Sequence, residues 1–286
     1  MRRFLIFLIV VTAVSCVKES RIDIPYAGNK IVVNSLIQPD SLIYIRVTSS
    51  KPVTEYQFEP LESATVVLKE DGITLPTPIY KLINGAGYFV SQAVAKTGSQ
   101  YSIHVENDGL TAVSAGDSTP IRPKISDGYA QRTLHRVRFT MQEDGSTNNY
   151  YRLRIFNADS VDGKWVIDKK DTIHFRLDPA LNNDLPDIIT NEYNSESIMT
   201  DANFNGKTIQ FVLQTEKEVN STHMIIEVSA LSAAAWQYLR STSDQRLSDS
   251  DSQNFSLDPE NAYSNVENGY GIVAGVNAAR LLFTVE

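Results

Sequence analysis

The sequence predicts an all-β fold: an N-terminal immunoglobulin-like β-sandwich over residues 22–123, then a larger β domain over residues 124–286 that carries one helix. The first observation behind this prediction is an alternation of apolar and polar residues, with a period of two, along most of the chain. The second is a set of Asp-Gly pairs, which favour the tight turns of β-hairpins. The third is a single alanine- and leucine-rich segment near residues 229–240, whose apolar residues fall at helical spacing.

The N-terminal domain is predicted from short strands joined by tight turns. Residues 43–48 and 101–106 alternate between apolar and polar side chains, and Asp71-Gly72 and Asp108-Gly109 supply hairpin turns. Several short strands with such turns are typical of a sandwich. The spacing of these segments fits a seven-stranded sandwich of the immunoglobulin type.

A stretch with two prolines, residues 118–123, separates the two predicted domains. We expect a stiff linker there, because proline fixes its own φ and biases the preceding residue away from helix. Beyond it the alternating segments are longer, and they lie at residues 136–141, 151–156, 173–177 and 209–214. Such strands have one buried face and one wet face, so we expect the helix near residues 229–240 to cover the open face or end of their sheet.

The first sixteen residues have the plan of a lipoprotein signal peptide rather than of a folded element. Two arginines precede an uninterrupted apolar run at residues 4–11, and small or modest side chains lead up to Cys16. The run is far shorter than the roughly 20 residues of a membrane-spanning helix. We therefore expect a signal peptide over residues 1–15, acylation of Cys16 as the new N-terminus, and a polar tether over residues 16–21.

Cys16 is the only cysteine of the chain, which excludes an internal disulfide. Its position after a small residue, at the end of the apolar run, resembles a bacterial lipobox in which Ala13 stands where leucine is usual. Two or more acyl chains hold a protein to a bilayer almost permanently, since each buried methylene contributes about 0.8 kcal/mol. The alternatives are an uncleaved signal anchor and a secreted protein with a chance cysteine.

The charge of the chain argues against one class of partner. Removal of residues 1–15, two of which are arginines, takes the chain from 286 residues with a formal net charge of −8 to 271 residues with −10. An acidic body repels nucleic-acid phosphates and anionic lipid surfaces, and no basic patch with interleaved aromatic residues occurs. We therefore expect no nucleic-acid partner.

The sequence predicts no catalytic residue, no metal site and no cofactor. It contains no Gly-x-Ser-x-Gly elbow, no phosphate-binding glycine loop and no His-Glu-x-x-His helix. An acidic loop at residues 249–260 follows an EF-hand count in part but lacks the required glycine, so we expect a solvated loop. The four histidines lack the close spacing of paired metal ligands; they are His104, His135, His174 and His223.

Five segments spread along the mature chain are similar to those of a known family in their order and spacing. They are residues 21–25, 30–37, 64–68, 150–155 and 261–275. Together they resemble a family of Bacteroidota lipoproteins catalogued as domain of unknown function 4249. The most specific piece contains Asn268-Gly269-Tyr270-Gly271, whose glycines permit close approach either to a ligand or at the turn that starts a closing strand. We favour the closing strand.

The resemblance implies an outer-membrane lipoprotein that is often encoded beside a TonB-dependent receptor. The tether Cys16-Val17-Lys18-Glu19 is similar to the lysine-plus-acid signal that sends such lipoproteins to the cell surface, although Ser20 stands where a second acid is preferred. The family has no established catalytic residues, and none are carried over to this chain.

The leading hypothesis is a non-enzymatic lipoprotein of the outer membrane, anchored through lipid on Cys16 and facing the cell exterior. It would be an accessory component of TonB-dependent nutrient uptake that binds a substrate or the TonB-dependent receptor, with the ligand unknown. The alternatives are a surface enzyme of unrecognised type and a structural or adhesive surface protein.

Replacing Cys16 by alanine removes the only thiol that could be acylated, so we expect Cys16→Ala to abolish incorporation of an alkyne-tagged palmitate into the protein. Metabolic labelling of cells followed by precipitation of the chain measures this. Ser20→Ala is the matched control, because it changes the tether and leaves the thiol in place. Label retained by Cys16→Ala, or absent from the unaltered chain, would contradict the lipid anchor.

Overall fold

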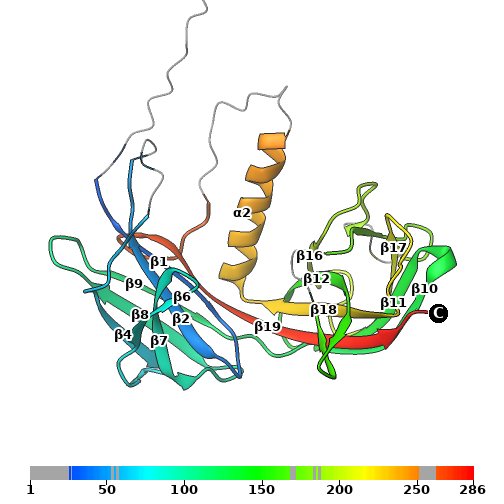
Figure 1. The fold of residues 1–286 in the computed structure, drawn as a ribbon, viewed down its shortest axis with the longest axis horizontal. Coiled ribbons are helices and arrows are strands. Elements are labelled where there is room, and N and C mark those ends of the chain that lie inside the picture. The colour runs from blue at the N-terminus through cyan, green and yellow to red at the C-terminus, as the bar shows by residue number, and fades with distance from the viewer. Residues whose placement is uncertain are drawn as a thin grey trace, which may run out of the picture.

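The computed structural model shows a mostly β molecule with two lobes, and in its described part a long helix, α2, lies between them (Figure 1). It describes residues 26, 28–52, 55, 58–167, 172–182, 185, 188–250 and 262–286, with backbone alone for 244–250. The N-terminal lobe consists of β1 to β9 and the C-terminal lobe of β10 to β18, while β19 runs through both. The predicted fold class, an immunoglobulin-like sandwich followed by a larger β domain with one helix, is confirmed.

One nine-stranded sheet passes through both lobes in the order β16-β12-β18-β19-β1-β2-β7-β6, with β3 paired beside β2. The C-terminal lobe contributes β12 (Tyr150–Asn157), β16 (Ser197–Thr200) and β18 (His223–Leu231). The N-terminal lobe contributes β1 (Ile31–Ile37), β2 (Leu42–Ser49), β3 (Glu59–Pro60), β6 (Ile79–Ile83) and β7 (Ala86–Val94). The two sets meet at β19 (Tyr270–Thr284).

A second sheet, in the order β5-β4-β8-β9, closes the N-terminal lobe as a sandwich. Its strands are β4 (Thr65–Glu70), β5 (Ile73–Thr74), β8 (Gln100–Glu106) and β9 (Val113–Ser118). Alternate residues of the two sheets, among them Ile45, Leu68 and Ile103, are buried between them. The described part of this lobe has nine strands where the sequence predicts seven, because β3 and β5 are two-residue strands too short to show an alternation.

The C-terminal lobe is built in the same way, with a sheet in the order β10-β11-β17-β15. Its strands are β10 (Lys124–Gln131), β11 (Arg136–Gln142), β15 (Phe175–Leu177) and β17 (Thr208–Thr215). A 3₁₀ turn (Arg132–Leu134) joins β10 to β11, and β13 (Asp159–Val161) pairs with β14 (Lys164–Val166) as a hairpin. The core is partly aromatic, with the rings of Phe139 and Phe211 stacked at 5.1 Å.

The long strand β19 belongs to both lobes, and Figure 1 shows it as the curved ribbon that connects them. Residues 270–275 pair in parallel with β1, and residues 276–284 pair in antiparallel fashion with β18. The predicted division at residue 123 does not account for this strand. Residues 22–123 lack the neighbour of β1, which comes from the far end of the chain.

Two glycines allow β19 to enter the N-terminal lobe. Gly271 has a φ of +108°, and a Cβ there would lie 2.1 Å from the carbonyl oxygen of Val33. Gly275 lies at the other end of the parallel segment, and a Cβ there would lie 2.1 Å from the carbonyl oxygen of Ser118. Glycine is therefore needed for close backbone contact, and the segment Asn268-Gly269-Tyr270-Gly271 starts the closing strand as predicted.

The helix α2 (Ala233–Ser250) begins four residues after the predicted start at residue 229 and ends ten residues beyond the predicted end at residue 240. The start is later because residues 229–231 belong to β18, where they pair with both β12 and β19. Ser232 then caps the helix, since its Oγ accepts a hydrogen bond from the backbone N–H of Ala235 at 3.1 Å. The first turns pack on β18 and β19, so the helix covers part of one sheet face as predicted.

We expect Gly275→Ala to lower the free energy of unfolding by about 1–3 kcal/mol, the usual range for overpacking. The reason is that β19 must move away from the carbonyl of Ser118 to admit a methyl group. Urea denaturation followed by circular dichroism measures the change. Gly72→Asn is the control, because Gly72 has open space around it and asparagine tolerates its φ of +82°. Equal losses in the two variants would contradict this account of β19.

Candidate functional site

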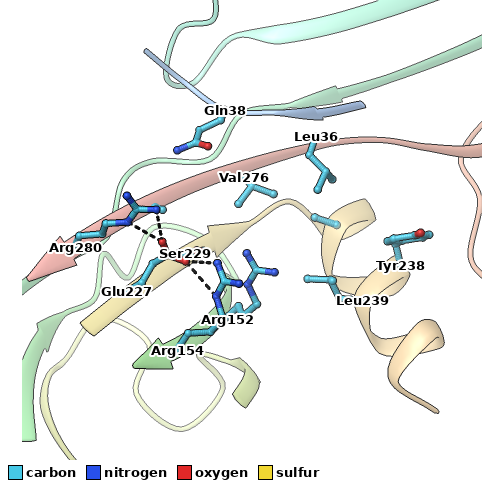
Figure 2. Close-up of a pocket in the computed structure, with 12 residues that line it drawn as sticks. Leu36, Gln38, Arg152, Arg154, Glu227, Ser229, Tyr238, Leu239, Val276 and Arg280 are labelled. Atoms are coloured by element: carbon cyan, nitrogen blue, oxygen red, sulfur yellow. Dashed lines mark hydrogen bonds and ion pairs between the residues drawn. The ribbon is translucent and has the colours of Figure 1, made fainter. Parts of the chain in front are cut away.

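A pocket of about 200 Å³ lies on the face of the nine-stranded sheet where the two lobes meet (Figure 2). One wall is formed by β12, β18 and β19, the facing wall by helix α2, and the end of β1 closes it from the N-terminal lobe. We call it the junction pocket. The residues that line it are Leu36, Gln38, Arg152, Arg154, Glu227, Ser229, Ala235, Tyr238, Leu239, Val276, Ala278 and Arg280.

The wall on the sheet is charged because alternate residues of paired strands point to the same face. The register places Arg152 opposite Ser229, and Arg154 opposite Glu227. On the other side of β18, Arg280 of β19 also lies opposite Glu227. Three arginines from two outer strands therefore flank one glutamate on the strand between them.

Glu227, Arg154 and Arg280 form the Glu227 cluster, in which one carboxylate accepts hydrogen bonds from two guanidinium groups (Figure 2). Arg154 contacts Oε1 through both Nε, at 3.2 Å, and Nη2. Arg280 contacts Oε2 through Nε at 2.8 Å and through Nη2 at 2.8 Å. The glutamate side chain is only 2 % exposed, so both of its oxygens are satisfied within the sheet.

The Glu227 cluster keeps its carboxylate ionised. Burial alone would raise the pKa of Glu227, but the hydrogen bonds and positive charges of Arg154 and Arg280 outweigh it and hold that pKa below its ordinary value. A carboxylate in this state retains no proton near neutral pH. Its chemical role is therefore that of a fixed negative charge rather than of a general acid.

Arg152 lies beside the Glu227 cluster on the side of helix α2, as Figure 2 shows. Its nearest carboxylate is that of Glu196, with 3.9 Å between Nη1 and Oε2, and its Nε has no hydrogen-bond partner among the described residues. Burial lowers the pKa of Arg152, and the positive charge of Arg154 lowers it further. The buried hydroxyl of Ser229, directly opposite on β18, is also without a partner in the described part of the chain.

The remaining walls of the junction pocket are mostly apolar. Leu36 and Val276 come from the sheet, while Ala235, Tyr238 and Leu239 come from α2. The helix is held in place by its apolar contacts and by a ring stack, in which Trp236 lies on Tyr150 with 4.8 Å between centroids. The pocket thus sets a charged sheet face against an apolar helix face.

Two other groups of hydrogen-bonded side chains, each with titratable members, are candidates for a catalytic site. Glu143 of the C-terminal lobe is buried and accepts hydrogen bonds from Asn149 and Tyr151. On the N-terminal lobe, His104 lies 2.8 Å from the Oγ of Ser114 and 3.0 Å from Glu106. The histidine and the serine are direct cross-strand neighbours, so the sheet register accounts for their contact.

Several predicted positions fall outside the described residues. Cys16, the tether over residues 16–21 and most of the acidic loop at residues 249–260 are among them. Among the described residues no helix is long and apolar enough to cross a membrane, and no three His, Cys, Asp or Glu side chains gather closely enough to hold a metal ion.

The four histidines come from different elements, and all four lie at exposed or half-buried positions. His135 and His174 lie on either side of β17, where their carbonyls accept hydrogen bonds from the backbone N–H groups of Thr215 and Glu216. His135 ends the 3₁₀ turn before β11, and His223 stacks on Trp165 with 4.1 Å between ring centroids.

The junction pocket was not predicted from the sequence, although Arg152 and Arg154 alternate with apolar residues and so were expected on the wet face of their strand. One signal was present. Glu227 is the only charged residue within residues 224–231, an otherwise apolar or small run. A charge in such a run needs a buried partner, but the sequence does not say which arginines supply it.

Replacing Glu227 by glutamine leaves two arginines facing each other without their shared carboxylate. We expect Glu227→Gln to lower the free energy of unfolding at neutral pH by about 3–5 kcal/mol, as for the loss of one partner of a buried ion pair. Because the pKa of Glu227 is lowered below 4.5, this stabilisation is fully present above that pH and is lost as the pH falls through the lower, folded-state value.

The difference between the unaltered chain and Glu227→Gln should therefore shrink as urea denaturation is repeated from pH 7 to below pH 4.5. Glu267→Gln is the matched control, because that side chain is exposed and outside the pocket. A difference that stays constant over this range would show that the charge of Glu227 is not what stabilises the sheet.

Known proteins give a family but no function. No curated protein matches the chain. Among solved structures, a chain of a cytokine receptor complex is similar over 71% of this chain and 92% of that chain, with 11% identity and a TM-score of 0.25. Trypsin-activated alpha-2-macroglobulin from Escherichia coli is similar over 72% of this chain and 14% of that chain, with 10% identity and a TM-score of 0.20. At these TM-scores neither structure supports an inference about this chain. The model of the family described as Domain of unknown function (DUF4249) matches residues 17–281, and the chain belongs to that family.

Proposed function

We propose that the chain is a non-enzymatic, lipid-anchored accessory protein of a TonB-dependent nutrient-uptake system in the outer membrane, facing the cell exterior. It binds a substrate in the junction pocket and contacts the transporter through the adjoining face of the same sheet. The anchor is the lipid on Cys16, in keeping with the signal-peptide plan of residues 1–16. The resemblance of the mature chain to lipoproteins encoded beside TonB-dependent receptors supports the uptake context.

The observation that carries the proposal is the junction pocket itself. Arg154 and Arg280 are fixed by ion pairs with Glu227, whose carboxylate is ionised and saturated with hydrogen bonds. Concave sites with an apolar wall and a few placed polar groups are typical of ligand binding. Because the pKa of Glu227 is lowered and both of its oxygens are engaged, this carboxylate serves neither as a general acid nor as a free nucleophile, which favours binding over catalysis.

An exposed apolar row lies next to the pocket on the same face of the sheet. It consists of Leu36, Tyr44 and Ile79, which are 57%, 41% and 48% exposed. Tyr44 and Ile79 both lie opposite Val90 of β7, so their side chains point to one face. Leu36 lies on that face because Asn34, two residues earlier, is paired with Arg46. Large exposed apolar side chains in one patch mark interaction sites.

A surface hydrolase is the second candidate, and the contact of His104 with Ser114 and Glu106 is the observation that favours it. The side chains of His104 and Glu106 are 41% and 64% exposed, so water screens their interaction. Ser114 and His104 lie directly opposite each other on β9 and β8, so the pairing of these two strands is enough to explain their contact. The junction pocket is the stronger basis for a function.

We expect native purification from detergent-solubilised membranes, with a tag after Glu286, to recover a TonB-dependent receptor in stoichiometric amount. A triple change of the apolar row, Leu36→Ser with Tyr44→Ser and Ile79→Ser, should lower that recovery at least tenfold, because it removes the apolar contact area.

The control for this experiment changes exposed apolar residues elsewhere, with Ile73→Ser and Ile121→Ser, which are 71% and 62% exposed in the unaltered chain. This control should recover the receptor in full. Recovery of the lipoprotein alone, in detergents that preserve such complexes, would overturn the uptake proposal and leave hydrolysis or adhesion as the better candidates.

A further inference from the structure

We propose that the ligand of the junction pocket is a small organic carboxylate, with Arg152 as the residue that binds its carboxylate group. This inference rests on the proposed function, since it names the class of substrate that the accessory protein would hold. It is carried by the unequal pairing of the three arginines, by a buried hydroxyl without a partner, and by the apolar wall opposite them.

The charges of the pocket do not balance. Arg154 and Arg280 share the carboxylate of Glu227, which has no further oxygen to offer. Arg152 is left with Glu196, whose carboxylate oxygen is 3.9 Å away at the outer limit of an ion pair. Three guanidinium groups therefore face two carboxylates, and the excess positive charge lies at Arg152.

The second observation comes from β18. Ser229 is 1 % exposed, lines the pocket, and its Oγ has no hydrogen-bond partner among the described residues. The Nε of Arg152, across the strand pair from it, is also unpaired. Buried polar groups are nearly always satisfied, so two unpaired groups on adjacent strands of one pocket point to a partner that supplies acceptors.

The acceptor is best supplied by a carboxylate. A guanidinium group presents parallel N–H donors that match the two oxygens of a planar carboxylate, and such charge-assisted bonds are the strong ones. An anion beside Arg152 also offsets the two effects that lower the pKa of Arg152, which are burial and the positive charge of Arg154. One guanidinium with a neutral hydroxyl suits a single negative charge better than the double charge of a phosphate.

The body of the ligand is limited by the opposite wall and by the volume. Leu36, Leu239 and Val276 present apolar surface a short way from the charged wall (Figure 2). The volume of about 200 Å³ exceeds the roughly 150 Å³ cavity that holds one benzene molecule. It is below the roughly 300–1,000 Å³ of sites for drug-sized ligands, so a ring-sized organic acid fits the pocket.

The test uses benzoate, benzamide and inorganic phosphate as probes, with the full chain purified in detergent and studied by isothermal titration calorimetry. Benzamide has the shape of benzoate without the charge. We expect benzoate to bind at least tenfold more tightly than benzamide, and its affinity to fall as salt is raised. Arg152→Gln should weaken benzoate at least tenfold, and Ser229→Ala should weaken it by a smaller factor.

Arg138→Gln is the matched control, because Arg138 is an exposed arginine of the same lobe that stacks on Tyr129 outside the pocket. It should leave the affinity for benzoate within twofold. Arg152→Lys keeps the charge but not the paired donors, so it should bind more weakly than the unaltered chain and more tightly than Arg152→Gln. Circular dichroism establishes that each variant is folded.

Three results would overturn the assignment: equal affinities for benzoate and benzamide, binding of phosphate without binding of benzoate, or unchanged benzoate affinity in a folded Arg152→Gln. The comparison of the first two probes needs no variant, so a variant that does not fold leaves the test intact. If benzoate fails while the receptor is still recovered, the ligand class is wrong and the uptake proposal stands. If benzoate binds while the receptor is never recovered, the uptake proposal fails and the site remains.

Discussion

Strand β19 sets the arrangement of the two lobes, because a single stretch of backbone completes the sheet of each. Residues 270–275 supply the neighbour of β1, and residues 276–284 supply the neighbour of β18. One continuous strand can form backbone hydrogen bonds with both β1 and β18 only if the two lobes keep a fixed orientation where β19 passes from one lobe to the other. Gly275 lies at that point, pressed against the backbone of Ser118 and bonded through its carbonyl to Ser232 before the helix. The helix, the sheet face and the end of β1 are thereby brought together.

The Glu227 cluster places buried charges on a sheet face, where apolar residues would stabilise the fold more. Burying an ion pair in a sheet face contributes less stability than packed apolar residues of the same size, because both charges lose their hydration. The outward positions of the same strands nearer to β13 do use apolar residues, since Phe156 lies opposite Ile225 there. Under the proposed binding function, the charges at the junction would serve the pocket rather than the stability of the sheet. Arg154 and Arg280 share the one carboxylate of Glu227, and with Arg152 beside them they give the pocket an excess of positive charge.

The fold class followed from local patterns, and those patterns have a physical cause. Alternation marks a strand with one buried face, so β2, β8, β11 and β12 were visible in the sequence. The two-residue strands were not, since a pattern needs several residues. The helix was placed too early because alanine and serine at the end of β18 fit either element, and pairing on both sides decided the outcome. The parallel pairing of β1 with β19 joins the two ends of the chain, and no local pattern encodes it.

The site could be predicted less well than the fold, for a related reason. In the sequence Arg152 and Arg154 alternate with apolar residues, a pattern that predicts the solvated face of a strand. They would be solvated if β12 were at the edge of an open sheet. They are enclosed because α2 and the end of β1 arrive from distant parts of the chain. Only the glutamate in the apolar run of β18 signalled a buried charge.

Leu36 connects the two surfaces on which the proposals rest. It lines the junction pocket and is also the most exposed member of the apolar row. With the pocket and the apolar row occupied as proposed, a ligand that packs on Leu36 would change the surface that a transporter meets. Coupling between two binding events is reciprocal, so the transporter would change the affinity for the ligand by the same factor by which the ligand changes the affinity for the transporter. Because the pocket is complete only when β19 is paired with both lobes, a bound ligand would also stabilise that junction, by an amount that rises with the logarithm of ligand concentration above its Kd. Capture of a substrate and contact with a transporter would then be linked through one side chain and one strand.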